Sequence, residues 1–568
     1  MRKTFFVLVL LFSIPAAAER PSGAAVATAQ PLATEAGLRI LAAGGNAFDA
    51  AVAVSAALAV VEPQSSGLGG GGFWLIHRAE DSFETMIDGR ERAPAAARPD
   101  MYLDDNGEVI PGLSMDGPLA AGIPGTPAAL VHVSQNYGRL ALAESLSPAI
   151  GYAREGFPVT PLYQRLARFR LDALKTSPAA ARIFLQGGAV PELGHRIRQP
   201  DLARTLEALA QHGVGGFYRG PVATRLVTAV REAGGIWTLD DLADYRVVER
   251  PPLRGRYGGL TVTAAAPPSS GGVALITMLN ILEGYDLAAL TPARRSHVII
   301  EAMRRAYRDR AQHLGDPDHV EVPTRQLIDK AHAARLRADI ALDRATPSTP
   351  RTDAQEPEGT DTTHFSILDG DGNYVAATLS INYPFGSGFV AEGTGVLLND
   401  EMDDFSAKPG AANAYGLVGN DANAIAPGKR MLSSMSPTFV TGPDRVAVLG
   451  TPGGSRIITM VLLGILEMAD GRDPQAWVAR PRFHHQYLPD KVFAEPDAFD
   501  EEVAAELRRL GHTLEVASQP WGNMQALLWD RQTGRVSAAS DPRGEGMSFP
   551  GAASMPVRQQ VPALNAAP

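Results

Sequence analysis

Residues 359–382 read GTDTTHFSILDGDGNYVAATLSIN, and their pattern indicates how this part of the chain folds. Thr363–Leu368 and residues 374–381 are rich in β-branched and aromatic side chains, which favour strands. The intervening Asp-Gly-Asp-Gly-Asn segment tolerates positive φ and is typical of a tight turn. The stretch therefore predicts an antiparallel hairpin whose first strand begins directly after Thr362.

Thr362 follows a polar segment, residues 345–361, that we interpret as a flexible linker because it contains prolines and no apolar period. A threonine hydroxyl needs a base, and a freed α-amino group on the same residue, with a pKa of about 8, can serve as one. This hypothesis requires cleavage of the bond between Asp361 and Thr362. Taken alone, the stretch is better explained as an ordinary junction between a loop and a strand.

Composition limits the classes of function. The 568 residues are 45% hydrophobic and 20% charged, as in globular proteins, and are enough for several domains or one large fold. A net charge of −10 argues against nucleic acid as a partner. The absence of cysteine excludes disulfides, thiolate metal sites and cysteine nucleophiles.

The N-terminus has the pattern of a secretory signal peptide. Arg2 and Lys3 precede a short apolar run, residues 4–14, and a small-residue cleavage site ends at Ala18. The run is too short for a membrane anchor. We expect residues 1–18 to be removed and the mature protein to be periplasmic or secreted.

Hydrophobic periodicity predicts alternating helical layers and antiparallel strands, an α+β arrangement. Two helices are expected within residues 31–61, the second capped by Asn46. Other helices are predicted at residues 141–155, 201–212, 220–234, 295–313, 457–469 and 501–510. Strands are predicted at residues 73–77, 260–264, 394–398, 437–440, 446–449 and 524–529, and around Leu514 and Val536. The long segment 408–429 has the length of a functional loop or lid.

The glycine-rich segment 67–72 precedes a predicted strand. Nucleotide-binding glycine loops instead follow a strand and open a helix, so that interpretation is disfavoured. Close approach of backbones beside a functional site explains the glycines better.

Few conventional catalytic motifs occur. The chain has no Gly-x-Ser-x-Gly and no His-Glu-x-x-His sequence, and the adjacent His484 and His485 would point to opposite faces of a strand. We therefore expect no metal and no cofactor. Gly453 and Gly454, where a turn opens a helix, offer backbone amides that could stabilise an oxyanion.

Several motifs in one order resemble γ-glutamyltranspeptidases, also called glutathione hydrolases. They are Thr-Thr-His at 362–364, Asn-Asp-Glu-Met-Asp-Asp-Phe at 399–405, Ser-Ser-Met-Ser-Pro at 433–437, Pro-Gly-Gly-Ser-Arg at 452–456, and Glu-Pro-Gln at 62–64 leading into the glycines. The resemblance spans nearly the whole mature chain. It implies the four-layer αββα sandwich of N-terminal nucleophile (Ntn) hydrolases. It also implies self-cleavage into a large subunit, residues 19–361, and a small subunit, residues 362–568, that remain together as a heterodimer.

The resemblance also assigns roles to individual residues. Thr362 matches the nucleophile, Ser380 a hydroxyl beside it, Gly453 and Gly454 the oxyanion hole, and Tyr415 the lid. The residues matched to the γ-glutamyl group are Arg90, Ser433 and Ser434 for its α-carboxylate and Asn382, Glu401 and Asp404 for its α-ammonium. This chain departs from related bacterial enzymes at Ser380, at Asp361 and at Tyr383-Pro384.

The implied function is a self-processing transferase and hydrolase acting on glutathione and other γ-glutamyl compounds through a γ-glutamyl-threonine ester. Water, an amino acid or a dipeptide would accept the acyl group. A glutaryl- or cephalosporin-type acylase of the same fold and a non-catalytic γ-glutamyl-binding homologue are the alternatives.

Overall fold

A computed structural model describes residues 20–349 and 362–551. The expected signal peptide and Asp361 lie outside these residues. No helix in the described part is long and apolar enough to cross a bilayer.

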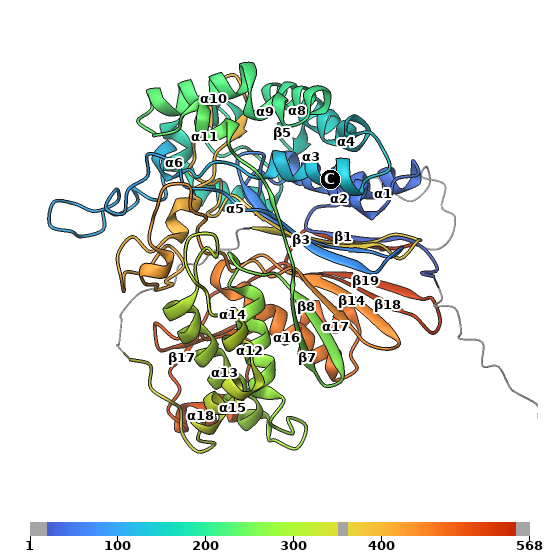
Figure 1. The fold of residues 1–568 in the computed structure, drawn as a ribbon, viewed down its shortest axis with the longest axis vertical. Helices are drawn as coiled ribbons and strands as arrows, with labels where there is room; N and C mark the ends of the chain where they lie inside the picture. The colour runs from blue at the N-terminus through green and yellow to red at the C-terminus, as the bar shows by residue number, and fades with distance from the viewer. Residues whose placement is uncertain (1–19, 350–361, 552–568) are drawn as a thin grey trace, which may run out of the picture.

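Two β-sheets are stacked between two layers of helices (Figure 1). The first sheet has the strand order β20 (Met547–Pro550), β1 (Ala25–Thr28), β9 (Thr363–Leu368), β10 (Tyr374–Ser380), β2 (Gly71–Arg78), β3 (Phe83–Gly89) and β6 (Val248–Arg250). The second has the order β19 (Val536–Ser540), β18 (Gln525–Asp530), β14 (Arg445–Gly450), β13 (Thr438–Thr441), β8 (Leu260–Ala264) and β7 (Leu253–Tyr257). Neighbouring strands in both sheets are antiparallel, so the predicted αββα sandwich is confirmed.

The helices cover the outer faces of the two sheets (Figure 1). One layer contains α1 (Pro31–Ala42), α2 (Ala47–Val61), α3 (Thr126–Tyr137), α4 (Leu142–Glu155), α5 (Pro161–Phe169), α6 (Leu171–Thr176), α7 (Pro178–Phe184), α8 (Pro200–His212), α9 (Gly215–Tyr218), α10 (Gly220–Glu232) and α11 (Leu239–Ala243). The other contains α12 (Gly271–Leu282), α13 (Pro292–His313), α14 (Thr324–Leu327), α15 (Lys330–Ala338), α16 (Ile457–Ala469), α17 (Pro474–Ala479) and α18 (Glu501–Arg509).

Short elements complete the chain. The minor strands are β4 (Phe157–Pro158), β5 (Arg196–Ile197), β11 (Val390–Ala391), β12 (Val396–Leu397), β15 (Phe483–His484), β16 (Val492–Ala494) and β17 (Leu514–Val516). The 3₁₀ turns are η1 (Pro118–Ala120), η2 (Glu401–Asp404), η3 (Asp421–Asn423) and η4 (Gly454–Arg456).

Alternating side chains bury both faces of the first sheet. On β2, Trp74 and Ile76 join the core beneath α2, whereas Phe73 and Leu75 join the core between the sheets. All four are at most 1% exposed. Each such apolar side chain contributes about 1.5–3 kcal/mol of burial free energy, so the first sheet is held from both sides.

The predicted hairpin is confirmed: β9 pairs with β10 from Thr363 opposite Leu379 to Leu368 opposite Tyr374. Asp369 closes the turn by accepting hydrogen bonds from the backbone amides of Asp371 and Asn373, each at 2.9 Å. Its second carboxylate oxygen accepts from the amide of Ala47, at the start of α2. The turn is therefore fixed to the helical layer.

Local signals also placed α2 correctly. The side chain of Asn46 accepts from the amides of Phe48 and Asp49, as expected for a cap. In contrast, the strand expected at 394–398 is only the two-residue β12. The first residues of the expected linker, 345–349, are held in place, with the amide of Ser348 donating to Asp490 at 2.8 Å.

The glycine run lies where strands and loops approach closely, as predicted. An added Cβ would lie 2.0 Å from the carbonyl oxygen of Leu397 at Gly69 and 2.1 Å from that of Ser380 at Gly70. Contacts this short with backbone atoms leave room for hydrogen alone.

We expect Gly70→Ala to lower the apparent midpoint of thermal unfolding at a fixed scan rate, because the new methyl group forces the backbone apart at a cost of about 1–3 kcal/mol. Gly151→Ala is the matched control, since a Cβ at this helical position meets nothing within 4 Å. Equal midpoints for the two variants would contradict the proposed close approach.

Candidate active site

Thr362 lies immediately before β9 and is buried, with 5% of its surface exposed. Its Oγ1 lies 3.0 Å from the Oγ of Ser380, the last residue of β10. The same Ser380 Oγ accepts a hydrogen bond from the amide of Asn382 at 2.8 Å. The hairpin thus holds a pair of hydroxyl groups at one end, and the amide of Asn382 orients Ser380.

Two residues at this end of the hairpin have left-handed backbone. Thr362 has φ 89° and Asn382 has φ 72°. Asparagine tolerates this region, but a β-branched residue rarely adopts it, and such strain costs about 1–3 kcal/mol. In the uncleaved chain the strain is therefore located at Thr362 itself.

A buried network of charges lies in the same site. The guanidinium of Arg90, in the loop after β3, pairs with Glu401 Oε2 at 2.6 Å and with Asp404 Oδ2 at 2.5 Å. Its Nε donates to the carbonyl of Met431 at 3.2 Å. The side chains of Arg90 and Glu401 are each 1% exposed. Bulk solvent therefore screens this ion pair little.

Burial and crowding change how these groups titrate. Burial raises the pKa of Glu401 to about 7, although the positive charge of Arg90 opposes the shift. Burial and the neighbouring Glu401 raise the pKa of Glu91 well above its ordinary value. Burial disfavours the charged form of Arg90, but Glu401 and Asp404 outweigh it and raise the pKa of that guanidinium. Around neutral pH, Glu401 is therefore partly protonated.

The turn between β14 and α16 provides backbone amides. Gly453 has φ 133° and Gly454 has φ 54°, and the turn leads through η4 into the N-terminus of α16. A helix N-terminus favours negative charge, so this turn is suited to a developing oxyanion. The ring of Tyr415 covers it: a Cβ on Gly454 would lie 2.4 Å from Tyr415 Cδ1. The Tyr415 hydroxyl also donates to the carbonyl of Asn382 at 3.0 Å.

Most of these groups line one cavity of ≈ 20 Å³. Its lining consists of Arg90, Thr362, Ser380, Asn382, Glu401, Asp404, Tyr415, Leu417, Ser433, Ser434, Met435, Gly454, Ser455 and Ile457. Gly453 is not part of this lining, although Gly454 beside it is, and Asp361 lies outside the described residues. The cavity has room for about one water molecule, so a larger ligand requires some of the lining residues to move.

A larger cavity of ≈ 800 Å³ lies around the turn of the hairpin, with Asp371 and Asn373 in its lining. Because Thr362, Ser380 and Arg90 are all absent from that lining, its size does not make it the site of chemistry.

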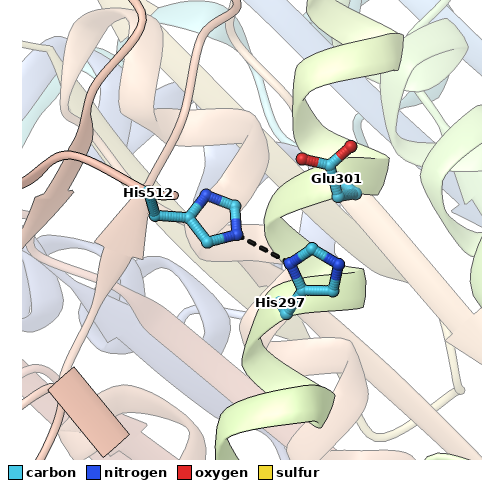
Figure 2. Close-up of side chains that lie close together, drawn as sticks. All are labelled: His297, Glu301 and His512. Carbon is cyan, nitrogen blue, oxygen red and sulfur yellow. Dashed lines mark hydrogen bonds between the residues drawn. The ribbon is translucent and has the colours of Figure 1, made fainter. Parts of the chain in front are cut away.

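A further cluster contains His297, Glu301 and His512, all buried (Figure 2). This cluster was not predicted, because His512 follows α18 whereas His297 and Glu301 lie on α13. His297 Nδ1 lies 2.7 Å from His512 Nε2. Glu301 already pairs with Arg305 at 2.6 Å and Arg304 at 3.2 Å. Because two guanidinium groups neutralise its one carboxylate, this cluster is poorly suited to a divalent cation.

Two charged residues near the cavity had no role in the sequence-based expectations. Glu91 is fully buried, and both of its carboxylate oxygens lack a hydrogen-bond partner among the described residues. Arg310 of α13 donates to the Oγ of Ser434. Glu91 could have been suspected from its position next to Arg90, but Arg310 is one of several arginines on its helix.

Residues 33–551 match the family model described as Gamma-glutamyltranspeptidase. The glutathione hydrolase proenzyme of Pseudomonas sp. (strain A14) is 44% identical over 95% of this chain and 94% of the relative. The glutathione hydrolase proenzyme of Escherichia coli (strain K12) is 42% identical over 91% of this chain and 90% of the relative. The acylase ACY 1 proenzyme of Pseudomonas sp. (strain SE83) is 36% identical over 92% of each chain.

Two solved structures show the same fold. The cephalosporin acylase from Bacillus halodurans has a TM-score of 0.83 and 30% identity, covering 96% of this chain and 99% of that one. The γ-glutamyltranspeptidase of Helicobacter pylori has a TM-score of 0.55 and 38% identity, covering 61% of this chain and 95% of that one. Together with the family match, these similarities mean that the chain belongs to the γ-glutamyltranspeptidase family of self-processing γ-glutamyl transferases and hydrolases.

Proposed function

We propose that this enzyme cleaves the γ-glutamyl bond of glutathione and related compounds, with Thr362 as nucleophile. The observation that carries the proposal is the buried pairing of Arg90 with Glu401 and Asp404 in the cavity that contains Thr362. The head of a γ-glutamyl group bears one carboxylate and one ammonium. A site with both signs of charge matches that zwitterion.

Processing comes first. The hydroxyl of Thr362 attacks the carbonyl of Asp361, the acyl group moves from nitrogen to oxygen, and water hydrolyses the resulting ester. Relief of the left-handed strain at Thr362 favours breaking this bond. The products are a large subunit, residues 19–361, and a small subunit, residues 362–568, that remain associated.

Catalysis then uses the new α-amino group. It takes the proton from Thr362 Oγ1 as that oxygen attacks the γ-carbonyl, and later delivers the proton to the leaving amine. The amides of Gly453 and Gly454 stabilise the oxyanion, where one lost donor typically costs about 3 kcal/mol. Water, an amino acid or a dipeptide then resolves the γ-glutamyl-threonine ester.

Substrate binding exchanges one set of ion pairs for another. Without ligand, the guanidinium of Arg90 is shared between the carboxyl groups of Glu401 and Asp404. The substrate's α-carboxylate binds Arg90, Ser433 and Ser434, while its α-ammonium binds Asn382, Glu401 and Asp404. Because the head is neutral overall, it can enter without leaving a buried charge uncompensated.

An acylase is the second candidate, favoured by the overall similarity to the cephalosporin acylase structure. A glutaryl group has a carboxylate but no ammonium. If the glutaryl carboxylate bound Arg90, Asp404 and Glu401 would be left without a cationic partner. The charge balance of this site therefore favours γ-glutamyl donors.

The signal-peptide pattern of residues 1–18 supports a periplasmic or secreted location for the mature heterodimer. No cofactor is required by this mechanism.

We expect Thr362→Ala to remain one chain on a denaturing gel, whereas the unmodified protein gives two fragments, because the variant has no hydroxyl to attack Asp361. Thr362→Ser, which keeps the hydroxyl, is the matched control and should still be cleaved. Two fragments from Thr362→Ala would overturn the processing mechanism.

Asp404→Asn should lower kcat/KM for γ-glutamyl-p-nitroanilide by about tenfold or more, since a charge-assisted bond to the ammonium contributes about 1.5–3 kcal/mol. Cleavage of glutaryl-p-nitroanilide should stay the same or rise, because that donor has no ammonium. Equal losses on both donors would indicate a structural role only, and faster glutaryl than γ-glutamyl cleavage by the unmodified enzyme would favour the acylase.

L-Glutamate should bind more tightly at pH 8 than at pH 5.5. Below a pKa of about 7, Glu401 is protonated and cannot neutralise the ammonium, so binding at lower pH must first release that proton. Calorimetric titration in buffers of different ionisation enthalpy measures both the affinity and the proton release. Glu401→Gln should flatten the pH dependence; an unchanged profile would assign the titration to another group.

A further inference from the structure

Arg310 is a buried cation with an unusual set of partners. It lies near the end of α13 and is 5% exposed. Its Nε donates to Ser270 Oγ at 3.0 Å, and its NH2 donates to Ser434 Oγ at 3.4 Å. Within residues 20–349 and 362–551, no carboxylate forms an ion pair with it, whereas Arg304 and Arg305 on the same helix both pair with Glu301.

A buried guanidinium without a counter-ion is unfavourable. Burial lowers the pKa of Arg310, Tyr307 and Asp404 counteract the shift, and the positive charge of Arg90 adds to it. Arginine nevertheless remains charged in proteins. The ligand-free protein thus holds a positive charge here that a bound anion could balance.

The contacts of Arg310 direct that charge toward the catalytic cavity. Ser434 lines the cavity together with Arg90. Because Ser434 Oγ accepts from Arg310, its own proton points elsewhere and is available to an acceptor. Ser270, the second partner, donates through its Oγ to the carbonyl of Ser433 at 2.7 Å. One guanidinium therefore contacts Ser434 directly and the backbone of Ser433 through Ser270.

We propose that Arg310 is a positioning residue for recognition of the donor's α-carboxylate: it holds Ser434 as a hydrogen-bond donor and supplies a second positive charge beside Arg90. This inference rests on the proposed γ-glutamyl specificity. It accounts for a difficulty in the site, since a carboxylate that approaches Arg90 alone also meets the negative charges of Glu401 and Asp404. Arg310, which contacts Ser434, adds positive charge on the serine side of the cavity.

The test compares two donors that differ in the α-carboxylate alone, γ-glutamyl-p-nitroanilide and 4-aminobutyryl-p-nitroanilide. Arg310→Met should raise KM for the first donor at least tenfold and change its kcat less than threefold. It should leave kcat/KM for the second donor within twofold. Arg310→Lys, which keeps the charge but not both hydrogen bonds, should give an intermediate KM.

Arg308→Met is the matched control, because this arginine lies on the same helix and its side chain is 38% exposed. Arg308→Met should leave kcat and KM unchanged for both donors. Complete processing on a gel and an unchanged circular dichroism spectrum show that each variant is folded. Should Arg310→Met fail to fold, the comparison is made with Arg310→Lys, whose KM should rise severalfold for the γ-glutamyl donor only.

Equal losses on both donors would overturn the role of Arg310 while leaving γ-glutamyl cleavage by the unmodified enzyme intact. Failure of the unmodified enzyme to cleave γ-glutamyl-p-nitroanilide would instead overturn the proposed function. Ser434→Ala provides an independent check: its effect on KM should be much smaller in the Arg310→Met background than alone, and additive effects would contradict the coupling.

Discussion

The buried ion pair from Arg90 to Glu401 and Asp404 is the interaction on which the site depends. It joins residues 311 and 314 positions apart, one following β3 of the first sheet and the others in η2. Removing one partner of a buried pair typically costs about 3–5 kcal/mol, because the other charge is left uncompensated. Such a pair is weak as a source of net stability. It keeps both signs of charge, already desolvated, at the place proposed for the zwitterionic head of the substrate.

The proposed nucleophile, Thr362, is positioned by the sheet and not by ion pairs. Thr362 is the last residue before a strand that lies between β1 and β10 in the interior of a sheet, with both faces buried. The neighbouring strands fix the position of its backbone, and Ser380 on the paired strand fixes the hydroxyl. Charge recognition thus depends on loops, whereas the reacting oxygen depends on the sheet.

The sequence was sufficient to predict those parts of the fold and the site that depend on local signals or on the order of motifs. Turn residues located the β9–β10 hairpin, Asn46 located the start of α2, and motif order brought together the residues that line the cavity. It was insufficient for α12, which was not predicted, because all of its residues are buried and it has no amphipathic period. The edge strand β20 was missed since its pairing with β1 joins opposite ends of the chain. The contact between Arg310 and Ser434 had no sequence signal either, as 124 positions separate them.

The order of strands has a consequence for the lifetime of the mature enzyme. In the first sheet, β1 lies between β20 and β9, so a strand from before the proposed cut is inserted between two strands from after it. Before cleavage, folding is a unimolecular reaction of one chain. After cleavage the same sheet can be rebuilt only by the encounter of two chains, and its recovery then depends on their concentration. Maturation would therefore make unfolding practically irreversible in dilute surroundings, and the enzyme's persistence would be set by its unfolding rate.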